Sequence, residues 1–169
     1  MRRIFKFALL LVLAFGIVLV SLACGQKRSA YDILMGALEK EKQRPTGEIY
    51  RSGADFGEAG YLSSDMISLL YGHNAEKFDF LLIEEYAIYI CSFAEPFEAA
   101  VFRCYSESDT DSVAKMCFYR VDTVSSLVSL LGYEGIETRV MTDGRNVYMY
   151  IGTNADGAES AFMASGNDT

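Results

Sequence analysis

The chain has 169 residues, 51% of them apolar and 13% aromatic, which is enough for one domain with a sizeable core. Its 15 basic residues stand against 23 acidic ones, so the formal net charge is −8. This balance argues against a nucleic-acid partner, because phosphate recognition needs a basic face. It argues equally against an electrostatic attraction to anionic lipid.

The first segment of the chain is typical of a secretory signal. Three basic residues among the first six precede an uncharged apolar run over residues 7–23, and polar residues follow Cys24. Removal of residues 1–23 leaves 12 basic and 23 acidic residues, a charge of −11. The rest of the chain is therefore expected to be an acidic domain outside the cytoplasm.

The residues before Cys24 predict how this signal is processed. A lipoprotein signal ends in a short box of apolar and small residues before the cysteine that receives a diacylglycerol. The chain reads Val20-Ser21-Leu22-Ala23-Cys24, with the leucine one place later than usual. We expect a lipid on Cys24 that holds the protein on the extracytoplasmic face of the cell membrane. An uncut anchor and plain secretion stay open, because the run is near spanning length and its end also fits ordinary signal cleavage.

Residues 24–60 are predicted to form a tether. Ser29 can cap a helix that runs through Gln43, before Pro45 stops it. The apolar stripe of this helix is thin, so we expect a spacer helix rather than part of the core. A short strand and a glycine-rich loop follow over residues 48–60.

The domain itself is expected over residues 61–164. A helix over residues 63–71 precedes two aromatic-rich segments, 78–93 and 97–105, which predict strands that pair antiparallel. Apolar residues at steps of three or four then predict a long helix that ends at Gly132. Its expected core face is Val113, Cys117, Val121, Val124, Val128 and Leu131.

The closing part of the domain is predicted to be a β-hairpin and a short helix. Segments 137–142 and 145–152 flank Asp143-Gly144, which favours a type I′ turn. A helix over residues 155–164 and a frayed tail over residues 165–169 follow. The order of elements predicts an α+β fold, with an antiparallel-dominated sheet and helices packed mainly on one face.

Pairing around that turn sorts the hairpin residues onto two faces. The face expected to point inward carries Val140, Val147, Met149 and Ile151. The opposite face carries Arg139, Tyr148 and Tyr150. Aromatic residues beside an arginine are typical of protein interfaces, so these three residues are a candidate interaction surface. A helix that covers this face is the alternative.

Residues that carry chemistry are few. The single histidine, His73, sits at a predicted helix end, and no set of residues has the spacing of a zinc site or a catalytic triad. We therefore expect no catalytic residue, no metal and no cofactor. Glu98 lies in a predicted strand, and Arg120 of the next helix is its candidate partner in a structural ion pair.

One stretch resembles a known family. The sequence "FEAAVFRCYSESDTDSVAKMCFYRVD", residues 97–122, resembles domain of unknown function family 4358, whose members look like small lipoproteins of Gram-positive anaerobes. "DGRNVYMYIG", residues 143–152, is similar to that family's closing strand. The resemblance covers about residues 61–163, and the tail of the long helix, residues 121–131, departs from it. It implies an envelope location and a shared fold, and no activity.

The sequence therefore predicts a lipid-anchored envelope protein whose domain binds another protein or an envelope component without catalysis. The alternative is an envelope enzyme that acts through carboxylates such as Glu98. A pocket where two acids converge with raised proton affinity would favour the enzyme. An apolar patch or groove would favour the binding protein.

Overall fold

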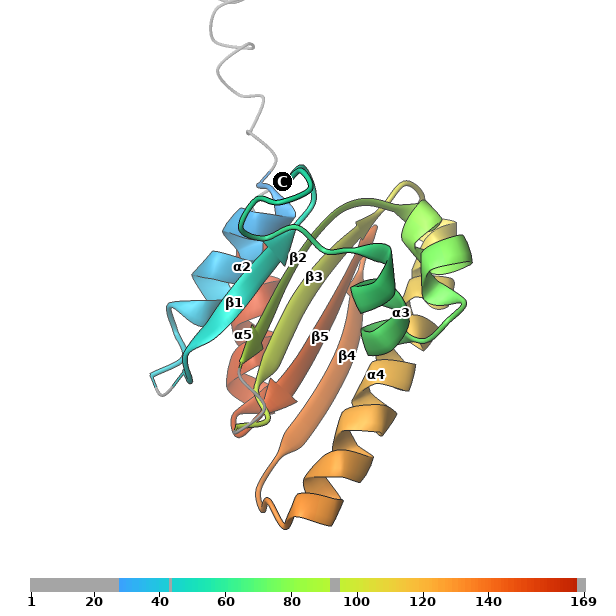
Figure 1. Cartoon of the computed structure of the whole chain (residues 1–169). Coiled ribbons are helices and arrows are strands. Elements are labelled where there is room, and N and C mark those ends of the chain that lie inside the picture. Colours follow the sequence, from blue (N-terminus) through green and yellow to red (C-terminus); the bar gives the residue numbers. More distant parts are fainter. Residues whose placement is uncertain (1–27, 43, 92–94, 167–169) are drawn as a thin grey trace, which may run out of the picture.

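The structure is a computed structural model that describes residues 28–42, 44–91 and 95–166. A five-stranded antiparallel sheet lies at its centre, with the strand order β1-β2-β3-β5-β4 (Figure 1). The strands are β1 (Gly47–Arg51), β2 (Ile83–Cys91), β3 (Glu98–Cys104), β4 (Glu137–Asp143) and β5 (Asn146–Gly152). The predicted α+β class with an antiparallel sheet is confirmed.

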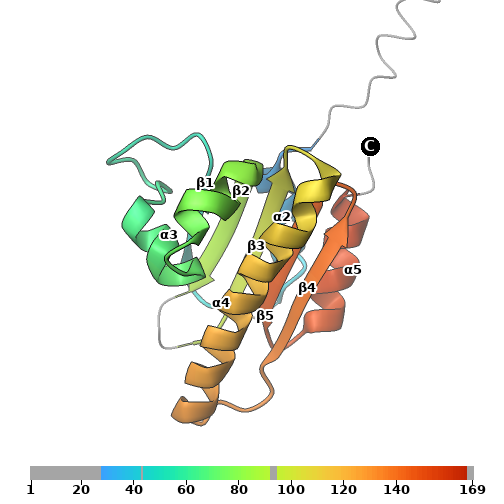
Figure 2. The ribbon, with the colours of Figure 1, turned by 90° about the vertical axis from the view of Figure 1, so that its right-hand side faces the viewer.

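Helices cover both faces of this sheet, as Figures 1 and 2 show. α2 (Ala30–Leu38) and α5 (Ala155–Gly166) pack on one face, and α3 (Ser64–Tyr71) and α4 (Thr110–Leu131) pack on the other. The sequence predicts helices mainly on one face, and the structure differs in this respect. The middle strand explains the difference, because all seven residues of β3 are buried and its alternate residues enter separate cores on the two faces.

The predicted tether is largely part of the domain. Ser29 caps α2 as expected, through a capping box with Asp32. Ile33 and Leu34 of this helix are 2% and 0% exposed, since they pack against the sheet and α5. β1 pairs with β2 along its whole length and forms an edge of the sheet. The folded domain therefore begins at α2 and not at residue 61.

The segment before β2 is helical where a strand was predicted. A π-helical turn, η1 (Ala75–Asp79), and a 3-10 turn, η2 (Phe80–Leu82), occupy the first part of the aromatic-rich run. Phe80 packs at its ring edge against Tyr86 and Phe102, with centroid distances of 5.6 and 6.2 Å. Contacts with the neighbouring core thus outweigh the local preference of aromatic residues for a strand. A second short 3-10 turn, η3 (Glu107–Asp109), leads into α4.

The hairpin turn lies one residue later than predicted. Gly144-Arg145 form the turn, with φ of 53° at the glycine and no positive φ at the arginine, which is the pattern of a type II′ turn. Val140 pairs with Met149, whereas a turn at Asp143-Gly144 would pair it with Val147. The register differs by two residues, so every side chain keeps its predicted face. The predicted inward residues do lie in the core beneath α3 and α4.

The long helix α4 follows its predicted stripe until its last turns. Val113 and Cys117 are fully buried, and Val121 and Val128 are nearly so. Figures 1 and 2 show the C-terminal turns of α4 extending past the ends of β3 and β5. Leu131 is consequently 57% exposed, although the stripe predicted it to be in the core.

The packing of α2 yields a test of where the domain begins. Leu34→Ala should lower the free energy of unfolding by about 2–5 kcal/mol, because it removes a fully buried side chain from the core. Urea denaturation of the variant and the parent measures this difference. Lys40→Ala, at an exposed position just after the same helix, serves as the control and should leave the midpoint nearly unchanged. Equal midpoints for all three proteins would show that α2 is a spacer.

Candidate functional site

A groove lies between α3, the C-terminal half of α4 and the end of the sheet where β2 leads to β3. We call it the α3–α4 groove. Its volume is about 340 Å³. Most of its lining is apolar, and the walls include Leu70, Ile90, Val124, Leu127, Val128 and Ile151. Such a hollow, with a few polar groups among apolar walls, is the usual form of a binding site.

The spacing of residues along α4 produces one wall of the groove. Residues 120, 123, 124, 127, 128 and 131 line it, at steps of three or four that place them on one face of a helix. Gly72 ends α3 with φ of 94°, a conformation that favours glycine, so the chain turns away after Leu70 and Tyr71. α3 is therefore short, and the groove opens between its last residues and the second half of α4.

A buried ion pair forms the floor of the groove. Nη2 of Arg120 lies 2.8 Å from Oε2 of Glu98, and its Nε donates a hydrogen bond to the same oxygen at 2.9 Å. The Tyr71 hydroxyl donates to Oε1 of Glu98 at 3.4 Å. The side chains of Glu98 and Arg120 are 4% and 15% exposed. The structural ion pair predicted from the sequence is thus formed, and it joins β3, α4 and α3.

Burial decides the electrostatics of this pair. It raises the pKa of Glu98 above the ordinary value of 4.5, and the Arg120 guanidinium and the Tyr71 hydroxyl offset only part of that effect. Burial also raises the pKa of Tyr71 well above 10.0, helped by the Glu98 charge, so its hydroxyl stays protonated as a donor. Burial acts to lower the pKa of Arg120, but the carboxylate outweighs it and the net direction is upward. Each oxygen of Glu98 thus has a donor, Arg120 on Oε2 and the Tyr71 hydroxyl on Oε1.

The hairpin surface predicted from Arg139, Tyr148 and Tyr150 is not open. Tyr148 and Tyr150 are 0% and 1% exposed, because α2 and α5 cover this face. The Tyr148 ring stacks on Phe162 of α5 at a centroid distance of 5.1 Å. Arg139 shares their face, as predicted, but it forms an ion pair with Asp156 of α5 at 2.7 Å. These residues anchor a helix, so the prediction of an interaction surface there was wrong.

The cysteines and the histidine singled out from the sequence lie in positions that indicate no catalytic role. Cys104 and Cys117 are fully buried, and burial raises the pKa of the Cys104 thiol to about 11. His73 is exposed just after α3, in a shallow hollow with Lys115 and Tyr119. Among residues 28–42, 44–91 and 95–166, no group of three or more His, Cys, Asp or Glu side chains is placed to hold a metal ion. The predicted lipid attachment site, Cys24, lies outside these ranges.

The α3–α4 groove was not predicted from the sequence, although part of its signal was present. Leu127 and Leu131 lie near the end of α4, and Leu127 falls off the predicted core stripe. A leucine outside the core stripe of an amphipathic helix indicates a second apolar contact. The other wall comes from β2 and β3, whose distance from α4 is set by the whole fold.

No known protein family, curated protein or solved structure matches this chain. The resemblance to domain of unknown function family 4358 therefore stays a prediction. Within the described part of the chain, no helix has the length and apolar character needed to span a bilayer.

The Glu98–Arg120 ion pair yields a prediction of how stability depends on pH when Arg120 is replaced. Arg120→Met should lower the free energy of unfolding by about 3–5 kcal/mol at neutral pH, because Glu98 is left as an unpaired buried carboxylate. Without Arg120 the pKa of Glu98 rises further. A raised carboxyl pKa in the folded state means that stability is retained below the ordinary value of 4.5 and lost as pH rises through the folded value. The deficit should therefore be smaller near pH 4.5 than at neutral pH, measured by urea denaturation.

The control is the double variant Arg120→Met/Glu98→Gln, which carries no charge at either position. Its deficit should be nearly the same in both buffers, since no carboxyl remains to titrate. A deficit of Arg120→Met that does not change with pH would contradict the assignment of the effect to Glu98.

Proposed function

We propose that this protein is a membrane-anchored extracytoplasmic lipoprotein, attached through a lipid on Cys24, whose domain binds a partner without catalysis. The observation that carries the binding function is the apolar α3–α4 groove, with exposed leucines at its mouth. The residues that carry the lipid anchor are the apolar run over residues 7–23 and the cysteine directly after it. An envelope protein is the expected kind of partner.

The mouth of the groove is rich in exposed apolar side chains. Leu69, Leu127 and Leu131 line it and are 75%, 45% and 57% exposed. Soluble domains expose large apolar side chains singly, and a cluster beside a concave surface marks a contact site. Leu69 lies on α3, and Leu127 and Leu131 lie on the C-terminal half of α4, whose last turns extend past the ends of β3 and β5 (Figures 1 and 2).

The state of the carboxylates favours binding over the alternative of an envelope enzyme. General acid–base catalysis by a pair of carboxyl groups needs both side chains to reach one substrate. The buried acid in the groove, Glu98, has both oxygens held by Arg120 and Tyr71. The other acid in its lining, Glu95, is exposed at the mouth. These two carboxyl groups thus lie in different surroundings, and one of them is committed to a structural role.

The lipid anchor predicts where a variant protein is found in the cell. Cys24→Ala removes the sulfur that accepts the diacylglycerol, so the protein should move from the membrane fraction to the soluble extracytoplasmic fraction. Each acyl chain contributes about 0.8 kcal/mol per buried CH₂ to membrane binding, so its loss should be nearly complete. Cell fractionation and immunoblotting measure the distribution. Ser21→Ala, which keeps the cysteine and the small residue, is the matched control. Retention of Cys24→Ala in membranes would indicate an uncut anchor.

The groove predicts binding of an uncharged apolar probe. Nile red should bind the parent protein with increased fluorescence, and Leu127→Ser should weaken this binding several-fold, because Leu127 lines the groove. Leu130→Ser is the control, since Leu130 lies on the same helix, is 82% exposed and is outside the lining. Equal losses for the two variants would show that the dye binds the helix surface and not the groove.

A further inference from the structure

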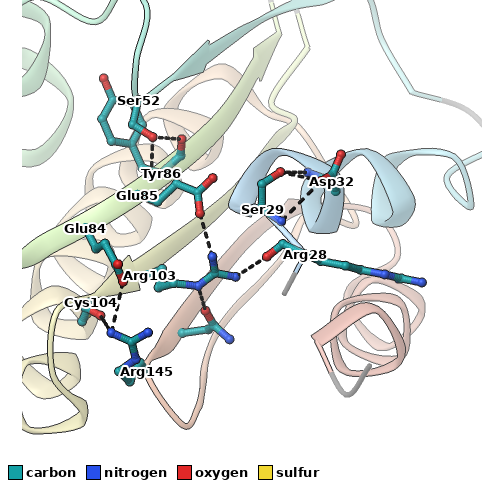
Figure 3. Close-up of polar contacts among 11 residues, drawn as sticks. Arg28, Ser29, Asp32, Ser52, Glu84, Glu85, Tyr86, Arg103, Cys104 and Arg145 are labelled. Carbon is teal, nitrogen blue, oxygen red and sulfur yellow. Dashed lines mark hydrogen bonds and ion pairs between the residues drawn. The ribbon is translucent and has the colours of Figure 1, made fainter. Parts of the chain in front are cut away.

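The two ends of the central strand β3 lie at opposite ends of the domain. At its C-terminal end, Nη2 of Arg103 donates a hydrogen bond to the backbone oxygen of Arg28 at 2.6 Å (Figure 3). Nη1 of Arg103 also forms an ion pair with Glu85 at 2.7 Å, so the arginine is fixed in place. At the N-terminal end of the strand, Glu98 forms the floor of the α3–α4 groove. Five steps of strand separate Glu98 from Arg103, a distance of about 17 Å.

The chain between the proposed lipid and the domain is short. Four residues lead from Cys24 to Arg28, and a fully extended chain of that length spans at most about 14 Å. Arg28 is bonded to the fold at the far end of β3 from the groove. If the groove faced the bilayer, Arg28 would lie at least the length of β3, about 17 Å, from the membrane. Residues 24–28 span at most about 14 Å, which is too short for that distance. The groove therefore does not face the bilayer, provided that Cys24 carries the lipid.

The charges that line the groove indicate what kind of occupant it accepts. Among the described lining residues, the charged ones are Glu95, Glu98 and Arg120. Arg120 is neutralised by Glu98, which leaves the exposed carboxylate of Glu95 at the mouth. An anionic head group, such as that of a fatty acid or an acidic phospholipid, would meet this negative charge. A basic side chain would be attracted by it.

We propose that the α3–α4 groove binds an apolar protein segment that carries lysine or arginine beside its apolar residues, presented from a side other than that of the bilayer. This inference rests on the proposed lipid anchor and binding function, and it names the chemistry of the partner. The volume of about 340 Å³ is near the lower end of the range of roughly 300–1,000 Å³ for ligand sites, which suits a few apolar side chains. Leu127 and Leu131 would contact those side chains, and Glu95 would face the basic residue.

The binding test uses the full chain with Cys24→Ala and two synthetic amphipathic peptides of equal length, one of leucine and lysine and one of leucine and glutamate. Isothermal titration should show the leucine–lysine peptide binding about tenfold more tightly, a difference of about 1.4 kcal/mol. Added salt should reduce this preference, because it screens the exposed Glu95. Glu95→Gln should reduce the preference several-fold, whereas Glu107→Gln, at the other end of the domain, should leave it unchanged. Leu127→Ser should weaken binding of both peptides, and Leu130→Ser should not.

Several results would overturn the proposed occupant. Equal or tighter binding of the leucine–glutamate peptide would contradict the charge argument. Displacement of bound Nile red by monomeric laurate, but by neither peptide, would identify a lipid-binding groove instead. If Nile red itself does not bind the groove, the proposed binding function fails, and that result is distinct from the choice of occupant.

The orientation of the domain can be measured separately, because the chain contains no tryptophan. Tyr105→Trp places a fluorophore beside the Arg103 end, and Leu130→Trp places one at the groove end; the parent residues are 62% and 82% exposed. The lipidated proteins are bound to phosphatidylcholine vesicles that contain a dansyl-labelled lipid. Energy transfer should be several-fold more efficient from Tyr105→Trp. Equal or reversed efficiencies would overturn the orientation, and failure to bind the vesicles would overturn the lipid anchor on which it rests.

Discussion

The burial of β3 on both faces is the constraint on which the rest of the structure depends. All seven residues of this strand are buried, so both sides of the sheet need a helical layer. Ala99 and Ala100 point to opposite faces, and their small side chains let the helices approach the sheet closely. Charged side chains occur only near the ends of the strand, as Glu98 and Arg103. Each has an ion-pair partner, since an unpaired buried charge costs several kcal/mol.

These two ion pairs join parts of the chain that are distant in sequence. Glu98 connects β3 to Arg120 of α4 and Tyr71 of α3, and so fixes the floor of the α3–α4 groove. Arg103 connects β3 to Glu85 of β2 and to the backbone just before α2. The strand thereby separates the point where the chain enters the domain from the groove. A charged residue near each end of an otherwise apolar strand thus helps to fix the start of α2 and the α3–α4 groove at opposite ends of the domain.

Features of this fold that depend on local periodicity could be predicted from the sequence, and features that depend on contacts between distant elements could not. The stripe of α4 and the faces of the hairpin follow from local periodicity, and the faces survived an error of two residues in register because a strand repeats every second residue. The uninterrupted apolar runs of β3 and β5 indicated that these strands are buried on both faces of the sheet. The burial pattern of β4, in contrast, is mixed. The role of α2 depends on a surface formed by β2, β3 and α5, and a nine-residue helix carries too little information to predict it. The Glu98–Arg120 pair was predictable, whereas the groove above it depends on where α3 ends relative to α4.

The acidic charge of the domain and the exposed leucines at one end have opposite effects on association between copies of this chain. An apolar rim such as that of Leu127 and Leu131 would promote association between identical copies if nothing opposed it. With 23 acidic residues against 15 basic ones, each copy repels another, and the carboxylate of Glu95 at the mouth adds to that repulsion locally. The same charge would attract the basic residue of the proposed occupant. The apolar rim supplies contact area without selectivity, and the negative charge then disfavours a second copy of this chain and favours a partner of opposite charge.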